Sequence, residues 1–251
     1  MRILEYGKEN KNRILMVQGS CMNIDLWDKT LDILKEKYHI ILPVIPGHDY
    51  ESSEEFTDCE DISKRLERDL LNLGYDSFEA AYGFSMGGSL LIKIMDYGNL
   101  RFKRVLLDGG ITPYDIPKVL TRLISFRDFL KGKLFTANKK LMMKMLSHYD
   151  YPMESAEKFY RAFSSMTNKS MYNVFYSCNN YSIDLPIKFD GKIVYWYGDR
   201  ERKARQKDIK NCRIYFPQIE FEEFEGMDHG QFVSLNPQAF SKKFDEFMET
   251  N

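Results

Sequence analysis

The sequence predicts an α/β fold, a mostly parallel doubly wound sheet with an inserted helical lid. Short apolar runs alternate with amphipathic helical patterns over residues 1–111. This alternation is typical of parallel strands joined by helices that cover both faces of a sheet. It stops over residues 112–185, where the patterns are helical, and resumes over residues 186–251. We therefore expect a core formed by 1–111 and 186–251, and a lid formed by 112–185.

The elements of the first core segment follow from its apolar periodicity. A strand, a turn and a second strand at 13–17 are expected at the start of the chain. Further apolar runs predict strands at 38–44, 78–82 and 105–107. Apolar residues repeat every three or four positions at 25–37, 62–73 and 86–97, which predicts helices there. Right-handed crossovers should connect the parallel strands.

The last core segment continues the alternation. An apolar run at 192–197 predicts a buried strand, and 219–224 alternates like a strand. A charged helix is expected from about 202 to 212. The final helix, at 236–248, carries Phe240, Phe244 and Phe247 on one face.

Residues 112–185 differ in composition from the rest of the chain. Helical patterns occur at 117–130, 138–146, 154–165 and 170–178. The segment holds six of the thirteen methionines and 13 of the 36 aromatic residues, and its net charge is +5 against −6 for the remainder. Methionines and aromatic rings suit an adaptable apolar pocket, although most must pack the segment's own helices. The charge contrast fits either an anionic substrate or docking on an acidic core.

Composition excludes several function classes. With 36 basic and 37 acidic side chains in 251 residues, the chain lacks the basic excess of a general nucleic-acid binder. It has no apolar run of about 18 residues and no signal-peptide pattern, so we expect a cytoplasmic protein without membrane or nucleic-acid partners. The four cysteines lack paired spacing, and no dinucleotide, P-loop or zinc motif occurs. We expect no cofactor and no metal; the sequence leaves the oligomeric state open.

One motif carries the chemistry. Residues 83–87 read G-F-S-M-G, after a predicted strand and at the start of a predicted helix. A strand-to-helix turn this sharp strains Ser85, and glycines on either side remove side chains that would collide. The serine oxygen then projects above the sheet, where the helix N-terminus offers N–H groups to a developing oxyanion. This context indicates that Ser85 is a nucleophile rather than part of an ordinary turn.

A serine nucleophile needs a base, and the chain has four histidines. His39 lies in a predicted strand, His48 in a loop and His148 in the predicted lid. His229 follows the predicted strand at 219–224, at the edge where a doubly wound sheet places its functional groups. We predict that His229 is the general base.

The base in turn needs a carboxylate that orients its ring. Asp199 and Glu201 follow the predicted strand at 192–197, and Asp108 ends the strand at 105–107. The sequence pattern alone leaves all three open, because each is also suited to a surface or capping position.

The order of Ser85, an acid and His229 resembles that of the α/β-hydrolases with a lid, and the resemblance covers essentially the whole chain. It implies the α/β-hydrolase fold. In that family the acid often stands three residues after a glycine, which implies Glu201 here, with Asp199 as the runner-up. Glutamate at this position departs from the more common aspartate.

The resemblance also implies an oxyanion hole of two backbone N–H groups. One belongs to Met86, the residue after the nucleophile, and the other to Ser20, with Cys21 as an alternative. Gln18 stands where the family commonly has histidine, and its side chain can also hold the loop by hydrogen bonding. We expect Cys21 to be a small buried residue rather than a nucleophile.

The implied activity is that of a serine hydrolase. It would cleave a carboxylic ester or related acyl compound through an acyl-enzyme, with a small-molecule substrate bound under the lid. Thioesterase, acyltransferase, amidase, C–C hydrolase and aminopeptidase reactions use similar sites. A catalytically idle ligand-binding protein is the remaining alternative.

Overall fold

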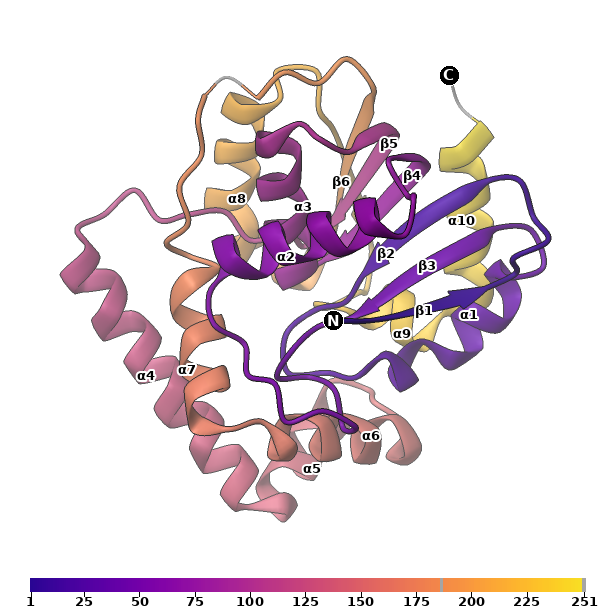
Figure 1. The fold of residues 1–251 in the computed structure, drawn as a ribbon. Helices are drawn as coiled ribbons and strands as arrows, with labels where there is room; N and C mark the ends of the chain where they lie inside the picture. Colours follow the sequence, from indigo (N-terminus) through magenta and orange to yellow (C-terminus); the bar gives the residue numbers. More distant parts are fainter. Residues whose placement is uncertain (186, 250–251) are drawn as a thin grey trace.

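The computed structural model describes residues 1–185 and 187–249, and it confirms the predicted α/β class (Figure 1). Within these residues one seven-stranded sheet has the order β1-β3-β2-β4-β5-β6-β7. In this sheet β1 runs antiparallel to its neighbour, and the other pairs are parallel. The strands are β1 Arg2–Tyr6, β2 Arg13–Val17, β3 His39–Val44, β4 Ser77–Phe84, β5 Arg101–Asp108, β6 Lys192–Gly198 and β7 Glu220–Phe224.

Helices cover both faces of the sheet. One face carries α2 Cys59–Asn72, α3 Met86–Tyr97 and α8 Arg202–Tyr215. The other face carries α1 Asp28–Leu34 and α10 Pro237–Glu249. The side chains of β2 alternate between the two cores: Leu15 and Val17 pack with the first group, Ile14 and Met16 with the second. Since both faces are buried, this strand reads as a continuous apolar run.

Two short elements differ from the expected ones. The helix expected at 25–37 begins as the 3-10 turn η1 Ile24–Trp27, capped by the Asn23 side chain, and α1 then ends at Leu34. A helix of five residues, α9 Gln231–Leu235, precedes α10 and has no periodicity long enough to detect.

Four helices lie between β5 and β6, in the segment 112–185. They are α4 Lys118–Ala137, α5 Lys139–His148, α6 Met153–Ser165 and α7 Asn168–Ser177. Helix α4 packs on α7 and α5 packs on α6, while α6 also contacts η1 of the core. Figure 1 shows this group at one end of the sheet. The expected core boundary at residue 186 and the final residues 250–251 lie outside the described part of the chain. None of the described helices is long and apolar enough to cross a membrane.

Candidate active site

The turn between β4 and α3 holds Ser85 in a strained conformation. Its backbone has φ 50° and ψ −113°, which is rare for a residue with a side chain. The Ser85 N–H donates to the Asp108 carbonyl over 2.8 Å, which ties the turn to β5. A Cβ on Gly83 would lie 2.7 Å from the Gly87 carbonyl oxygen, and one on Gly87 would collide with the Val17 carbonyl. Both glycines of the motif are therefore required by close backbone approach.

His229 and Glu201 form a short hydrogen bond, with 2.7 Å between Nδ1 and Oε2. Glu201 ends the 3-10 turn η2 Asp199–Glu201 directly after β6, and its other oxygen accepts from the Gly198 N–H at 3.2 Å. Burial raises the pKa of Glu201, but His229, Arg205 and the Gly198 N–H together bring this pKa below its usual range. Glu201 is therefore held ionised beside the imidazole.

The other two candidate acids have different partners. Asp199 and Glu201 lie two residues apart on a 3-10 turn, where the side chains of such positions point in different directions. No hydrogen bond between Asp199 and His229 occurs in the described structure. Asp108 accepts from the Tyr82 hydroxyl at 2.7 Å, and burial raises the pKa of Asp108 to about 7. The structure thus brings Glu201 to His229, and it places Asp108 nearby in a separate hydrogen bond.

The loop that carries His229 is fixed from two sides. The Asp228 N–H donates to Gln231 Oε1 at 2.7 Å, and the His229 N–H donates to Asp228 Oδ1 at 2.7 Å. The Gln231 amide also donates to the Tyr149 carbonyl of the inserted segment. The imidazole packs against Phe84, with ring centroids 4.7 Å apart and an angle of 37° between the ring planes. Gln231 could not be singled out from the sequence, since its role depends on these contacts.

The remaining histidines are engaged elsewhere. His39 contacts Glu5 at 3.0 Å, and burial lowers the pKa of His48 to about 4 while its Nδ1 lies 3.2 Å from the Pro46 carbonyl. His148 ends α5.

The loop after β2 lies beside Ser85. Gln18 donates through Nε2 to the Met22 carbonyl at 2.9 Å, so it holds the loop as expected for this residue. Ser20 and Cys21 both line the pocket that contains Ser85. Cys21 has a φ of 61°, and burial raises the pKa of its thiol to about 12, which disfavours a reactive thiolate. Met86 begins α3, where first-turn N–H groups have no intrahelical acceptor.

Ser85 and His229 line one cavity of about 390 Å³, a volume suited to a small molecule. Aromatic side chains from the inserted segment form much of its wall: Phe135, Tyr149, Tyr151, Phe159, Phe163 and Phe175. Of the segment's six methionines only Met145 lines this cavity, and Met142, Met166 and Met171 are buried in the core. The rings, more than the methionines, therefore shape the wall.

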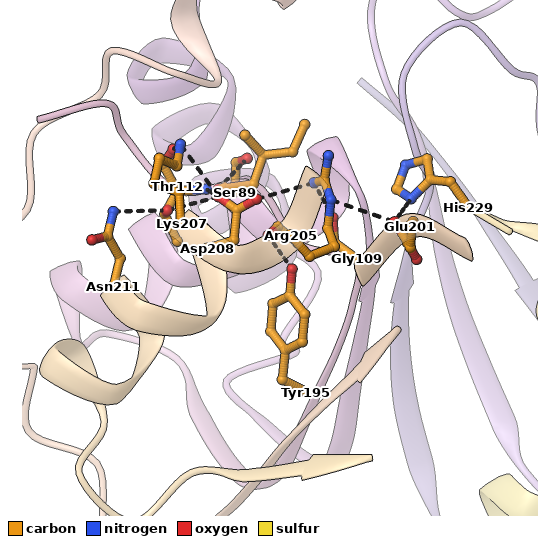
Figure 2. A network of polar contacts seen from close by, with 12 residues as sticks. Ser89, Gly109, Thr112, Tyr195, Glu201, Arg205, Lys207, Asp208, Asn211 and His229 are labelled. Carbon is orange, nitrogen blue, oxygen red and sulfur yellow. Dashed lines mark hydrogen bonds and ion pairs between the residues drawn. The ribbon is translucent and has the colours of Figure 1, made fainter. Parts of the chain in front are cut away.

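Behind Glu201 lies a charged network that sequence patterns did not indicate (Figure 2). Arg205 Nε lies 3.4 Å from Glu201 Oε2, and Arg205 Nη1 donates to the Gly109 carbonyl at 3.1 Å. The same guanidinium pairs with Asp208 at 3.2 Å. The only sequence signal is the spacing of four residues between Glu201 and Arg205, which is common on helices.

Asp208 extends this network to the start of the inserted segment. Its Oδ1 accepts from the Thr112 N–H at 2.9 Å and from the Thr112 hydroxyl at 2.8 Å. Lys207 and Asn211 also donate to oxygens of Thr112 (Figure 2). Helix α8 therefore connects Glu201 to the point where the inserted segment leaves the sheet.

Among the described residues, no three histidine, cysteine or carboxylate side chains are grouped as metal ligands. Cys21, Cys59, Cys178 and Cys212 are all buried and free.

Comparison with known proteins relates the chain to solved structures only: no family model and no curated protein matches it. An esterase from Thermogutta terrifontis superposes with a TM-score of 0.77 at 17% identity, covering 98% of this chain and 92% of its own. A protein described as an α/β hydrolase family member from Desulfitobacterium hafniense gives 0.76 at 19% identity, with coverage of 99% and 100%. An esterase from Exiguobacterium antarcticum gives 0.77 at 15%, with coverage of 99% and 95%. The strand order, the strained serine turn and these superpositions together show that the chain has the α/β-hydrolase fold.

Proposed function

We propose that this protein is a serine hydrolase that cleaves a carboxylic ester or related acyl substrate. The observation that carries the proposal is the joint geometry of the site. A strained Ser85 and a His229 bonded to a buried carboxylate line the same apolar cavity. Structural neighbours described as esterases are consistent with this activity.

In the proposed mechanism Ser85 Oγ attacks the substrate carbonyl. His229 Nε2 takes the serine proton, since Nδ1 is engaged by Glu201, and later passes it to the leaving group. Ionised Glu201 stabilises the imidazolium that forms. The N–H groups of Met86 and Ser20 would hold the tetrahedral oxyanion, and water then hydrolyses the acyl-enzyme.

We also propose that residues 112–185 act as a lid over this site. Their aromatic rings supply one wall of the cavity, and Tyr149 contacts the His229 loop through Gln231. A wall of this kind excludes water and favours an apolar acyl group over a charged one.

A fluorophosphonate probe tests the proposal, because it labels an activated serine whatever the substrate is. We expect an adduct on Ser85, located by peptide mass spectrometry, that is lost in Ser85→Ala and in His229→Ala. Ser234 also lines the cavity, so Ser234→Ala is the matched control and should label like the unmodified protein. Absence of an adduct on folded protein would contradict the proposal and favour an idle ligand-binding site.

Panels of esters, thioesters and amides, with an added acceptor alcohol, would then separate the related reactions. A product that carries the acceptor would indicate acyl transfer, and release of the free acid would indicate hydrolysis. Preference for thioesters or amides would reassign the substrate class while keeping the same nucleophile.

A further inference from the structure

Helix α4 packs on α6 and α7 mainly through small or polar side chains, and exposes most of its large apolar ones. Its buried residues are Thr121, Ser125 and Gly132, which are small or polar. A Cβ on Gly132 would lie 2.9 Å from the Phe163 ring, so the inward face is close-packed against α6 and α7. Helices at a protein surface normally turn their apolar side toward the core. In α4, Phe129 and Phe135 are partly buried against the core, but most of the large apolar side chains point the other way.

Six large apolar residues of α4 are exposed to solvent, at fractions between 48% and 66%. They are Val119, Leu120, Leu123, Phe126, Leu130 and Leu134. From Leu120 onward they recur every three or four residues, and Val119 lies four residues before Leu123, which puts all six along one side of the helix. Figure 1 shows α4 at the outer margin of the molecule, far from the sheet. We name these six side chains the α4 apolar face. Continuous exposed faces of this kind mark interaction surfaces.

The charges around this face are mostly positive. Helix α4 carries Lys118, Arg122, Arg127, Lys131 and Lys133 against Asp128 alone, so its net charge is +4 while the whole chain has −1. Asp128 pairs with Arg127 at 2.8 Å and with Lys131 at 3.6 Å. A second copy of the chain would bring a second helix of +4 against the first. An anionic surface instead complements both the charge and the apolar side chains.

We propose that α4 docks on an anionic lipid surface. The α4 apolar face would enter the boundary between headgroups and acyl chains, with basic side chains such as Lys118 and Arg122 against the lipid phosphates. The sequence-based expectation of no membrane partner rested on the lack of a spanning apolar run. That criterion detects helices that cross a bilayer, not helices that lie on one.

The opposite side of α4 belongs to the cavity. Asp128, Lys131, Gly132 and Phe135 line it together with Ser85 and His229. Docking through α4 would therefore place the proposed active site next to the lipid, where apolar acyl substrates partition. This consequence for substrate supply rests on the proposed function; the docking itself does not.

Co-sedimentation of the full chain with vesicles tests the proposal. The vesicles contain either equal amounts of phosphatidylglycerol and phosphatidylcholine, or phosphatidylcholine alone. We expect binding to the anionic vesicles, and a loss of about tenfold or more in partitioning for Leu123→Ser combined with Leu130→Ser. Leu73 and Ile214 are exposed to a similar degree on other elements, so Leu73→Ser with Ile214→Ser is the matched control and should bind normally.

Two more variants test the contribution of charge to docking and the independence of docking from catalysis. Lys118→Gln with Arg122→Gln should weaken binding to anionic vesicles and reduce its dependence on salt. Ser85→Ala should bind vesicles like the unmodified protein, so a failure of the proposed activity and a failure of docking are distinguishable.

Three outcomes would overturn the proposal. The first is recovery of the unmodified protein entirely in the supernatant. The second is binding of Leu123→Ser with Leu130→Ser as tight as that of the Leu73 and Ile214 control. The third is a dimer in sedimentation velocity that the Leu123 and Leu130 substitutions dissociate, which would assign the α4 apolar face to a second copy of the chain.

Discussion

Gly109 lies directly under the His229 ring, and its substitution tests whether the position of that ring controls activity. The residue has a φ of +56°, and a Cβ built on it lies 2.7 Å from His229 Cε1 and 2.8 Å from Nδ1. The backbone is held in place, since the Gly109 N–H donates to the Trp196 carbonyl at 2.9 Å and its carbonyl accepts from Arg205. In Gly109→Ala the ring must therefore move, not the backbone.

The size of this displacement follows from the structure. An ordinary carbon contact begins near 3.4 Å, so the imidazole must retreat by about 0.7 Å from the methyl group. Its 2.7 Å bond to Glu201 would lengthen or rotate out of line. A misplacement of about 1 Å in a catalytic group costs on the order of 10²-fold in rate. The positive φ adds about 1 kcal/mol of backbone strain, independent of the collision.

Gly98 provides the matched control, because it also has a positive φ, of +72°, but nothing lies within 4 Å of a Cβ built there. Both alanine variants should lose about 2–4 °C in Tm from the shared backbone strain. Only Gly109→Ala should lose about 10²-fold in the rate of Ser85 labelling by the fluorophosphonate probe. Labelling of Gly109→Ala within about twofold of Gly98→Ala would show that the position of the imidazole does not control activity.

Three further predictions concern the carboxylates around His229. Glu201→Gln should lower Ser85 labelling by about 10²–10⁴-fold, because an amide neither stabilises the imidazolium nor selects its tautomer. Asp199→Asn should label normally, and equal losses in the two variants would contradict the assignment of Glu201 as the acid. Burial raises the pKa of Asp108 from 3.8 to about 7, so the unfolded chain releases this proton at lower pH than the folded one, and stability falls as pH rises between these values. Asp108→Asn should therefore raise Tm more at about pH 8 than at about pH 5, which thermal unfolding at both pH values checks. Arg205 lowers the pKa of Glu201, so Arg205→Met should move the acid limb of the pH profile of Ser85 labelling to higher pH, and Arg205→Lys should largely restore the original profile. If Arg205→Met reduces Tm without moving this limb, Arg205 has a purely structural role.

Much of the architecture, and the positions of Ser85 and His229 in the candidate site, could be predicted from local sequence patterns. The steric limits of the strand-to-helix turn at Ser85 involve only the five residues of the motif, so the motif alone predicts the strained backbone that the structure shows. The position of His229 could be predicted, because a residue that follows a parallel strand lies at the carboxyl edge of the sheet.

The carboxylate that contacts His229 could not be identified from local sequence patterns. Asp199 and Glu201 differ by two positions, and only the 3-10 turn after β6 determines which carboxylate faces the imidazole. The family resemblance favoured Glu201, but local patterning did not separate the two. Arg205 and Asp208 could not be predicted for a related reason: their partners, Gly109 and Thr112, lie about a hundred residues earlier in the chain.

From the sequence alone it was possible to predict the alternation of strands and helices, a helical segment between two parts of the sheet, and Ser85 and His229 as candidate site residues. These features depend on periodicity and on steric limits within a few residues. Three features required the folded structure: the carboxylate that contacts His229, the aromatic rings that line the cavity, and the side of α4 that faces solvent. Periodicity shows that a helix has an apolar side, but packing decides whether that side faces the core. In α4 the packing is close where Gly132 meets Phe163, and Leu123 and Leu130 face solvent.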